Sequence, residues 1–172
     1  MGWYVVGLGS NLGGRLRNIL AALEILSGYT GIEKVSRVYL TEPLGPPQGW
    51  FLNMSVFCVT DIPPLEMLDL CKGIESELGR ATGPRWGPRV VDLDLLLWSG
   101  GCYYHKLLQI PHPRWCERLF VVRTLLDLGI DEVEGVSLKG VAGGLSNQRV
   151  IPLPCASKWV ETKFLRRVED FA

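Results

Sequence analysis

The sequence predicts an α+β fold, a ferredoxin-like α/β sandwich with a mostly antiparallel sheet and extra C-terminal elements. Segments patterned like strands and segments patterned like helices follow one another in the order β-α-β-β-α-β over residues 3–98. The chain has 172 residues, of which 47% are hydrophobic, and this is enough for a well-packed core. We therefore expect residues 1–172 to form a single domain, in which 129–172 add elements of undefined role.

Each element is predicted from a local pattern. An apolar strand at 3–8 is broken by Gly9-Ser10-Asn11, and apolar residues at helical spacing then predict a helix at 14–27. Two prolines at positions 63 and 64 mark the start of a second helix. The other predicted elements are strands at 32–40, 51–60 and 90–98, the second helix as far as residue 78, a hairpin arm at 103–110, and helices at 114–128 and 158–171. The extra C-terminal elements could pack on the sheet face opposite the first two helices.

Charge and cysteine content exclude several classes of protein. Basic and acidic residues number 18 each, so the formal net charge is zero, which argues against a protein that coats nucleic acid. Arginine outnumbers lysine by 12 to 6, which favours geometric recognition of a small anion. No targeting signal or membrane span is recognisable, and the five cysteines are scattered without a C-x-x-C pair. These features predict a cytoplasmic protein with reduced cysteines, of which Cys58 and Cys71 are packing residues.

The segment with the most chemical information carries two aspartates on a predicted strand. Asp92 and Asp94 are two residues apart and share one face, whereas the set Val91, Leu93, Leu95 and Leu97 points into the opposite layer. Two neighbouring carboxylates repel each other, and a divalent cation removes that cost. Mg²⁺ is commonly held by one or two carboxylates together with substrate phosphates. The alternative, two solvated acids on a half-exposed strand, is equally compatible with the strand alone.

Arginines beside this strand shift the balance towards phosphate chemistry. Arg85 and Arg89 flank Trp86 just before the two acids, and Arg80 lies one short loop upstream. Guanidinium groups bind phosphate oxygens, often with two hydrogen bonds. Trp86 offers an aromatic face for a planar ring or an arginine, or is a core residue. Carboxylates and arginines together are what polyphosphate chemistry requires.

Other ligand motifs are absent from the sequence. The glycine-rich segment 7–13 lacks both the G-x-G-x-x-G spacing and a Walker ending, so we predict a tight strand-to-helix turn, with Asn11 as a possible helix cap. His105 and His112 have no matching cysteine or histidine pairs, which argues against a zinc site.

Three motifs occur together in a characteristic order. They are Gly9-Ser10-Asn11-Leu12-Gly13, Arg85-Trp86-Gly87-Pro88-Arg89-x-x-Asp92-Leu93-Asp94, and Pro111-His112-Pro113 followed by Arg118 and Phe120. In these motifs the chain resembles the 6-hydroxymethyl-7,8-dihydropterin pyrophosphokinases of the folate pathway, over roughly residues 3–126. The resemblance implies a ferredoxin-like sandwich and the transfer of pyrophosphate from ATP to the hydroxymethyl group of the pterin, which leaves AMP. It also implies two Mg²⁺ ions.

The resemblance assigns roles to individual positions. It makes Asp92 and Asp94 the Mg²⁺ ligands, and it implies that Asn53 reads the amide-like edge of the pterin while Phe51 and Phe120 enclose the ring. The implied catalytic residues are Arg85, Arg89, Asp92 and Asp94; the pterin-binding residues are Thr41, Leu44, Phe51, Asn53, Trp86 and Phe120; the ATP-binding residues are Glu75, Arg80, Arg85, Arg89, His112 and Arg118. Glu75, on a predicted helix, also has the simpler interpretation of a solvated surface residue. Lys72 departs from the family, which often has a polar amide there, and the loop at 79–85 is short.

Two other classes of function compete with the enzyme. One is a non-catalytic binder, either a pterin- or nucleotide-sensing module or a partner-binding scaffold, but a binder needs no pair of metal carboxylates beside three arginines. The other is a nucleic-acid binder, whose expected basic, aromatic sheet is absent because the best strand carries two aspartates. We therefore expect a monomeric enzyme whose partners are the small molecules ATP and hydroxymethyldihydropterin, without nucleic acid or membrane.

Overall fold

The computed structural model describes residues 1–79 and 88–165. Arg80, Arg85 and Trp86, for which the sequence predicts roles, lie outside these ranges, so those roles stay predictions.

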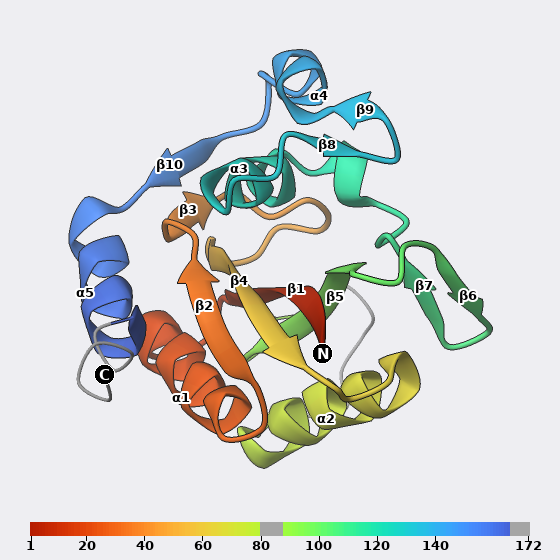
Figure 1. Cartoon of the computed structure of the whole chain (residues 1–172). Helices are drawn as coiled ribbons and strands as arrows, with labels where there is room; N and C mark the ends of the chain where they lie inside the picture. The colour runs from red at the N-terminus through yellow and green to blue at the C-terminus, as the bar shows by residue number, and fades with distance from the viewer. Residues whose placement is uncertain (80–87, 166–172) are drawn as a thin grey trace.

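The first part of the chain builds the predicted β-α-β-β-α-β unit, with one predicted strand divided into two (Figure 1). The elements are β1 (Gly2–Ser10), α1 (Arg15–Ser27), β2 (Gly31–Val35), β3 (Tyr39–Thr41), β4 (Phe51–Thr60), α2 (Pro64–Glu77) and β5 (Asp92–Trp98). The sheet has the strand order β10-β3-β4-β1-β5, with β2 also paired to β4, and each recorded pair is antiparallel. The α+β fold predicted from the sequence is confirmed.

The predicted strand at 32–40 is divided because side chains take over part of the hydrogen bonding at residues 36–38. The hydroxyl of Ser36 accepts a hydrogen bond from the backbone N–H of Ser55 at 2.8 Å. The backbone N–H groups of Arg37 and Val38 donate to Asp127 Oδ2 at 3.1 Å and to Ser157 Oγ at 2.9 Å. The chain therefore leaves the sheet for three residues while its polar groups remain hydrogen-bonded.

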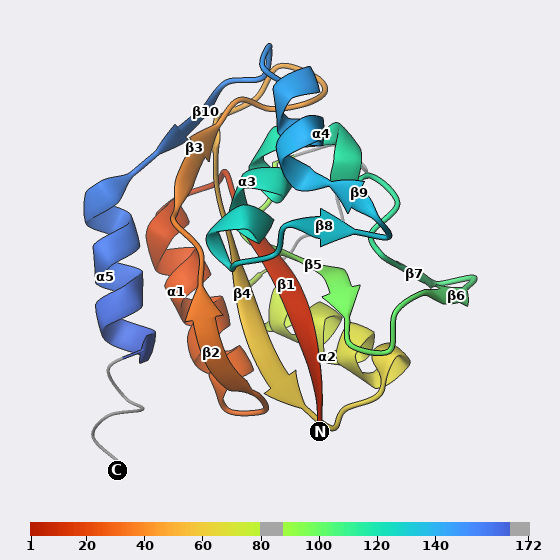
Figure 2. The same ribbon diagram turned by 45° about the horizontal axis from the view of Figure 1, so that its top comes forward.

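Helices cover both faces of the sheet (Figure 2), and an apolar layer lies between the sheet and the helices on each face. One face packs against α1 and α2, whose buried side chains recur every three to four residues, as the sequence predicts. The opposite face packs against α3 (Leu119–Asp127) and α4 (Leu138–Gly144). The residues buried on the first face include Val6, Leu8, Leu93 and Leu95, and those on the second include Val5, Leu96 and Leu97.

The layer predicted for Leu97 is wrong, and an irregularity in the pairing of β1 with β5 explains it. The register shifts between Val5 and Val6, so that Val6 is opposite Leu95 whereas Val5 is opposite Leu97. The intervening Leu96 is the extra residue of a β-bulge. Leu97 therefore joins the layer of α3 and not that of Leu93 and Leu95.

The C-terminal part divides between the two faces of the sheet. The hairpin arm is β6 (Tyr103–His105) with β7 (Leu108–Ile110), and the remaining strands are β8 (Glu132–Val133), β9 (Val136–Ser137) and β10 (Val150–Pro152), which extends the sheet beside β3. The last helix, α5 (Pro154–Leu165), begins four residues earlier than predicted, with a proline at its first position. Its Val160 and Phe164 join the layer of α1, so only α3 and α4 fit the expected packing on the other face. Among residues 1–79 and 88–165, no helix has the length and apolar character needed to cross a bilayer.

The helix predicted at 114–128 is interrupted before residue 119. A 3₁₀ turn at Trp115–Glu117 is followed by Arg118 in an extended conformation, and α3 begins only afterwards. The side chain of Gln148 makes the bonds that the helix loses, because its Oε1 accepts from Leu119 N at 2.9 Å and its Nε2 donates to Glu117 O at 2.8 Å. The interruption allows Arg118 to point away from the helix axis towards the sheet.

We predict that Phe164→Ala lowers the free energy of unfolding by about 3 kcal/mol, because it leaves a cavity between α5 and the first apolar layer. Phe164 is 6% exposed, whereas Trp159 on the same helix is 57% exposed. Trp159→Ala is therefore the matched control, with a change of less than about 1 kcal/mol. Urea unfolding of the full chain measures both, and equal losses would contradict the packing described for α5.

Candidate active site

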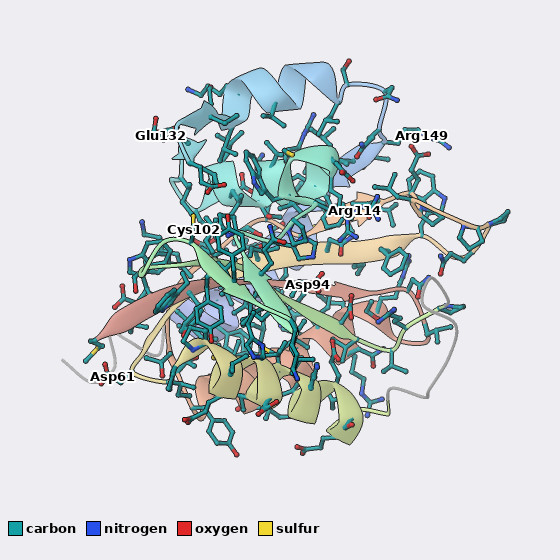
Figure 3. All side chains as sticks on the ribbon, turned by 90° about the vertical axis from the view of Figure 1, so that its right-hand side faces the viewer. Asp61, Asp94, Cys102, Arg114, Glu132 and Arg149 are labelled. Carbon is teal, nitrogen blue, oxygen red and sulfur yellow. The ribbon has the colours of Figure 1, made fainter. Side chains whose placement is uncertain are left out.

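A cavity of ≈ 400 Å³ opens on the α3 side of the sheet. Its floor is formed by β1, β4 and β5, the segment from His112 to Val121 forms the opposite wall, and Leu68, Lys72 and Glu75 of α2 also line it. Figure 3 shows Asp94 on the sheet and Arg114 in the layer above it. Every site residue that the sequence predicts within the described ranges lines this cavity: Thr41, Leu44, Phe51, Asn53, Glu75, Arg89, Asp92, Asp94, His112, Arg118 and Phe120.

Two glycines of β1 keep the floor open. Gly7 lies between Asp94 on β5 and Ser55 on β4, and Gly9 lies between Asp92 and Asn53. A Cβ atom at Gly9 would collide with Asn53 Oδ1. The expectation that segment 7–13 is a turn is therefore wrong for its first half, since β1 runs to Ser10. The sequence signal for this part of β1 was a glycine at every second position, Gly7 and Gly9. Such a pattern indicates that another group comes close to the backbone on one face of a strand.

The two aspartates point to the cavity side of β5, and each has an arginine partner. Arg89 Nη1 lies 3.1 Å from Asp92 Oδ1, and Arg118 Nη1 lies 3.9 Å from Asp94 Oδ2. Across residues 1–79 and 88–165, no three acidic, histidine or cysteine side chains are grouped closely enough to hold a metal ion alone. Two carboxylates with room for phosphate oxygens are nevertheless the donor set that suits Mg²⁺.

Glu75 is buried, so its interpretation as a solvated surface residue is wrong. It is 3% exposed, and its Oε1 accepts a hydrogen bond from the backbone N–H of Leu93 at 2.9 Å. Leu93 lies between the two aspartates, so the Glu75 carboxylate fixes the part of β5 that carries them. The same side chain also lines the cavity.

Asn11 ties together three segments that border the cavity. Its Oδ1 accepts from Arg89 N at 2.7 Å, and its own backbone N–H donates to Arg89 O at 3.1 Å. Its Nδ2 donates to Gln48 Oε1 at 2.9 Å and to Gly49 O at 3.1 Å. The prediction that Asn11 caps α1 is wrong, because Gly14 occupies the cap position and no side chain caps it.

Four of the six residues predicted to bind the pterin come from three elements. Thr41 ends β3, Phe51 and Asn53 belong to β4, and Phe120 belongs to α3. Asn53 Nδ2 donates to Thr41 Oγ1 at 2.7 Å, and both side chains are buried. This bond uses one N–H of the amide and fixes its orientation in the cavity wall.

His112 carries a neutral ring with a defined tautomer. Burial and the nearby charge of Arg118 lower its pKa to about 4, with a smaller effect from Arg114, while Asp92 opposes the shift. Its Nδ1 accepts a hydrogen bond from Arg114 N at 3.1 Å. Because Nδ1 is the acceptor, the hydrogen resides on Nε2, and we infer that the ring donates from that atom. Burial also lowers the pKa of Arg118.

The structure adds residues that the sequence analysis did not assign. Gln48, Ser55 and Arg114 line the cavity, and so does Lys72 at the position that departs from the family. Ser55 follows Asn53 by two residues on the same strand face, and this spacing was the one available signal. Arg114 forms an ion pair with Glu117, with its Nε 2.7 Å from Glu117 Oε2.

Carboxylates opposed by arginines and a neutral histidine form a site of the kind that phosphoryl-transfer enzymes require. Residues 5–130 match the family described as 7,8-dihydro-6-hydroxymethylpterin-pyrophosphokinase (HPPK). The chain therefore belongs to the HPPK family and is a pyrophosphokinase of that class.

Individual relatives agree with this assignment. The chain is 42% identical to the 2-amino-4-hydroxy-6-hydroxymethyldihydropteridine pyrophosphokinase of Bacillus subtilis over 126 residues, which are 72% of this chain and 75% of the relative. Identity to the Aquifex aeolicus protein of the same name is 36% over 154 residues, 89% of this chain and 96% of the relative. A similar solved structure is Plasmodium falciparum HPPK-DHPS with SDX-DHP, with a TM-score of 0.63 and 16% identity over 84% of this chain. That match shows the fold alone, and the chain spans 43% of that solved chain.

We predict that Asn11→Ala lowers the free energy of unfolding by about 2 kcal/mol, since it removes three side-chain hydrogen bonds from a residue that is 8% exposed. Asn11→Asp keeps the acceptor for Arg89 N but sets a carboxylate oxygen against Gly49 O, so it should destabilise the chain at least as much. The control is Asn147→Ala, the same change at an exposed asparagine. Urea unfolding measures all three, and equal effects at positions 11 and 147 would refute the role described for Asn11.

We also predict that His112 stays neutral in the folded protein down to about pH 5. The unfolded chain takes up this proton near pH 6.5, but the folded chain takes it up only near pH 4. The contribution of His112 to the free energy of unfolding is therefore complete above pH 6.5 and is lost as the pH falls towards 4. NMR chemical shifts of the ring, assigned with His112→Gln, should be constant from pH 5.5 to 8. A titration midpoint near 6.5 would show that the ring is not shielded as described.

Proposed function

We propose that the chain transfers pyrophosphate from ATP to the hydroxymethyl group of 6-hydroxymethyl-7,8-dihydropterin, which releases AMP, in folate biosynthesis. The observation that carries this proposal is the placement of Asp92 and Asp94 in one cavity with both arginine partners and with Asn53. The cavity therefore has two halves on one floor: a metal-and-phosphate half around Asp92 and Asp94, and a ring-binding half around Asn53.

The ring-binding half has the polarity that a pterin requires. Asn53 offers Oδ1 and its second N–H towards the cavity, because Thr41 takes the first N–H. This donor and acceptor pair complements the amide-like edge of the ring, and Phe51 and Phe120 supply apolar area for its faces. Leu44, which is 36% exposed, lies at the border of the same cavity.

The other half has the charge that a triphosphate requires. Arg89, Arg118 and the Nε2–H of His112 provide donors for phosphate oxygens. Glu75 holds the backbone of β5 in place and borders the space for the nucleoside. Two Mg²⁺ ions held by the two aspartates would neutralise phosphate charge and polarise the phosphorus under attack.

The reaction is an in-line displacement at the β-phosphorus of ATP. The hydroxyl oxygen of the pterin forms a bond to this phosphorus, the bond from the phosphorus to the oxygen shared with the α-phosphate breaks, and the hydroxyl proton goes to solvent. The protein orients the two substrates and offsets the developing charge. Roles for Arg80, Arg85 and Trp86 belong to this proposal as predictions from the family motif.

The test is to incubate the chain with ATP, Mg²⁺ and the hydroxymethyldihydropterin and to identify the nucleotide product. AMP formed in equal amount with pterin diphosphate supports the proposal. ADP would indicate an ordinary kinase, and the absence of any nucleotide product would favour a non-catalytic binder.

We predict that Asp94→Ala reduces turnover by about 1000-fold or more while far-UV circular dichroism and urea unfolding show an intact fold. Asp61→Ala is the matched control, since the Asp61 side chain is 78% exposed, pairs with the amino terminus and is not among the residues that line the cavity. It should retain full turnover. Near-normal activity of Asp94→Ala with Mg²⁺ would remove this carboxylate from the metal site.

A further inference from the structure

Ser55 places a buried hydroxyl at the floor of the cavity, next to the amide of Asn53. The two residues are two positions apart on β4 and share the face that lines the cavity. Ser55 is 2% exposed, and the residue opposite it on β1 is Gly7, which has no side chain to cover it. Its hydroxyl therefore belongs to the cavity wall as well as to the packing beneath α3.

The hydrogen of this hydroxyl is already in use. Ser55 Oγ lies 2.7 Å from Thr124 Oγ1, and either atom could be the donor by distance alone. Thr124 Oγ1, however, lies 2.8 Å from the backbone oxygen of Val121, which can only accept. A hydroxyl has one hydrogen, so Thr124 donates to Val121 and Ser55 donates to Thr124. Ser55 Oγ is left with lone pairs and no hydrogen for the cavity.

Neighbouring contacts hold Ser55 in this arrangement. Its backbone N–H donates to Ser36 Oγ at 2.8 Å, and its backbone oxygen accepts from Ser36 N at 2.9 Å. If Ser55 turned its hydrogen towards a ligand, either the Ser55–Thr124 bond or the Thr124–Val121 bond would be lost, because Thr124 has only one hydrogen to donate. The acceptor state is therefore favoured by one buried hydrogen bond.

We propose that Ser55 is a specificity-determining residue whose Oγ accepts a hydrogen bond from the 2-amino group of the bound pterin. This inference rests on the proposed function. An amino group beside the amide-like edge has two hydrogens, of which Asn53 Oδ1 can take one. A fixed acceptor on the same strand face takes the other, and it disfavours a ring that carries a carbonyl oxygen at that position.

A purely structural role makes a different prediction. If the Ser55 and Thr124 pair serves only to join β4 to α3, its removal lowers stability and leaves the relative affinity for two ring ligands unchanged. The test therefore compares the dissociation constants of the 2-amino substrate and of its 2-oxo analogue, measured by calorimetry, together with urea unfolding of each variant.

For the wild-type chain we expect the 2-oxo analogue to bind at least about tenfold more weakly. Ser55→Ala should weaken binding of the 2-amino ligand about tenfold with little effect on the analogue, so the preference falls. Thr124→Val frees the hydrogen of Ser55 to face the cavity, and it should improve binding of the analogue. Thr30→Val, which removes another buried hydroxyl bonded to a helix carbonyl, is the control and should leave the preference unchanged.

The outcomes separate this inference from the proposed function. An unchanged preference in both Ser55→Ala and Thr124→Val overturns the role of Ser55, even if the wild-type chain forms AMP. The expected shifts in a chain that forms no AMP support Ser55 and contradict the proposed reaction. A wild-type chain that binds neither ring ligand overturns both.

Discussion

Asn11 joins three segments that are far apart in the sequence, and the geometry of the cavity depends on it. Its four hydrogen bonds link the end of β1 to Arg89 and to the loop that contains Gln48 and Gly49. Arg89 in turn contacts Asp92, and the loop leads directly into Phe51 at the start of β4. The phosphate side and the ring side of the proposed site therefore share one buried side chain, so a displacement of either segment is transmitted to the other.

The face of the sheet towards α3 forms part of the core at one end of the strands and the floor of the cavity at the other end. At one end Trp3 stacks on Phe57, with ring centroids 5.1 Å apart, beneath the apolar layer of α3. At the other end Gly7 and Gly9 remove the side chains that would fill the same layer. On β5 the change from cavity to core occurs at the bulge at Leu96. The carboxylate of Asp94 faces the cavity, whereas Leu96 and Leu97 belong to the apolar layer of α3.

The sequence was sufficient for features that depend on local periodicity or on a long contiguous motif. The β-α-β-β-α-β order follows from such periods, and the motif residues within the described ranges line one cavity. Features set by distant partners were not predictable. Asn11 bonds residues 37, 38 and 78 positions away, and Ser55 depends on Thr124, 69 positions away. Glu75 is buried only because β5 supplies an N–H at its carboxylate, and strands of two or three residues have too little length for a period.

In the part of the site that the structure describes, two aspartates lie beside two arginines of opposite charge. Asp92 is paired with Arg89, and Asp94 lies near Arg118, so the carboxylates and guanidinium groups compensate one another in the protein alone. Under the proposed function, phosphate oxygens would bind the arginines and so free the aspartates for the cations. Cations would bind the aspartates and so free the arginines for the phosphate. A polyphosphate without a cation would leave two carboxylates facing its negative charge, and a cation without the polyphosphate would lie beside two arginines. Under the proposed function, the site would therefore bind the two ligands together more tightly than either one alone, and the difference is a coupling free energy between them.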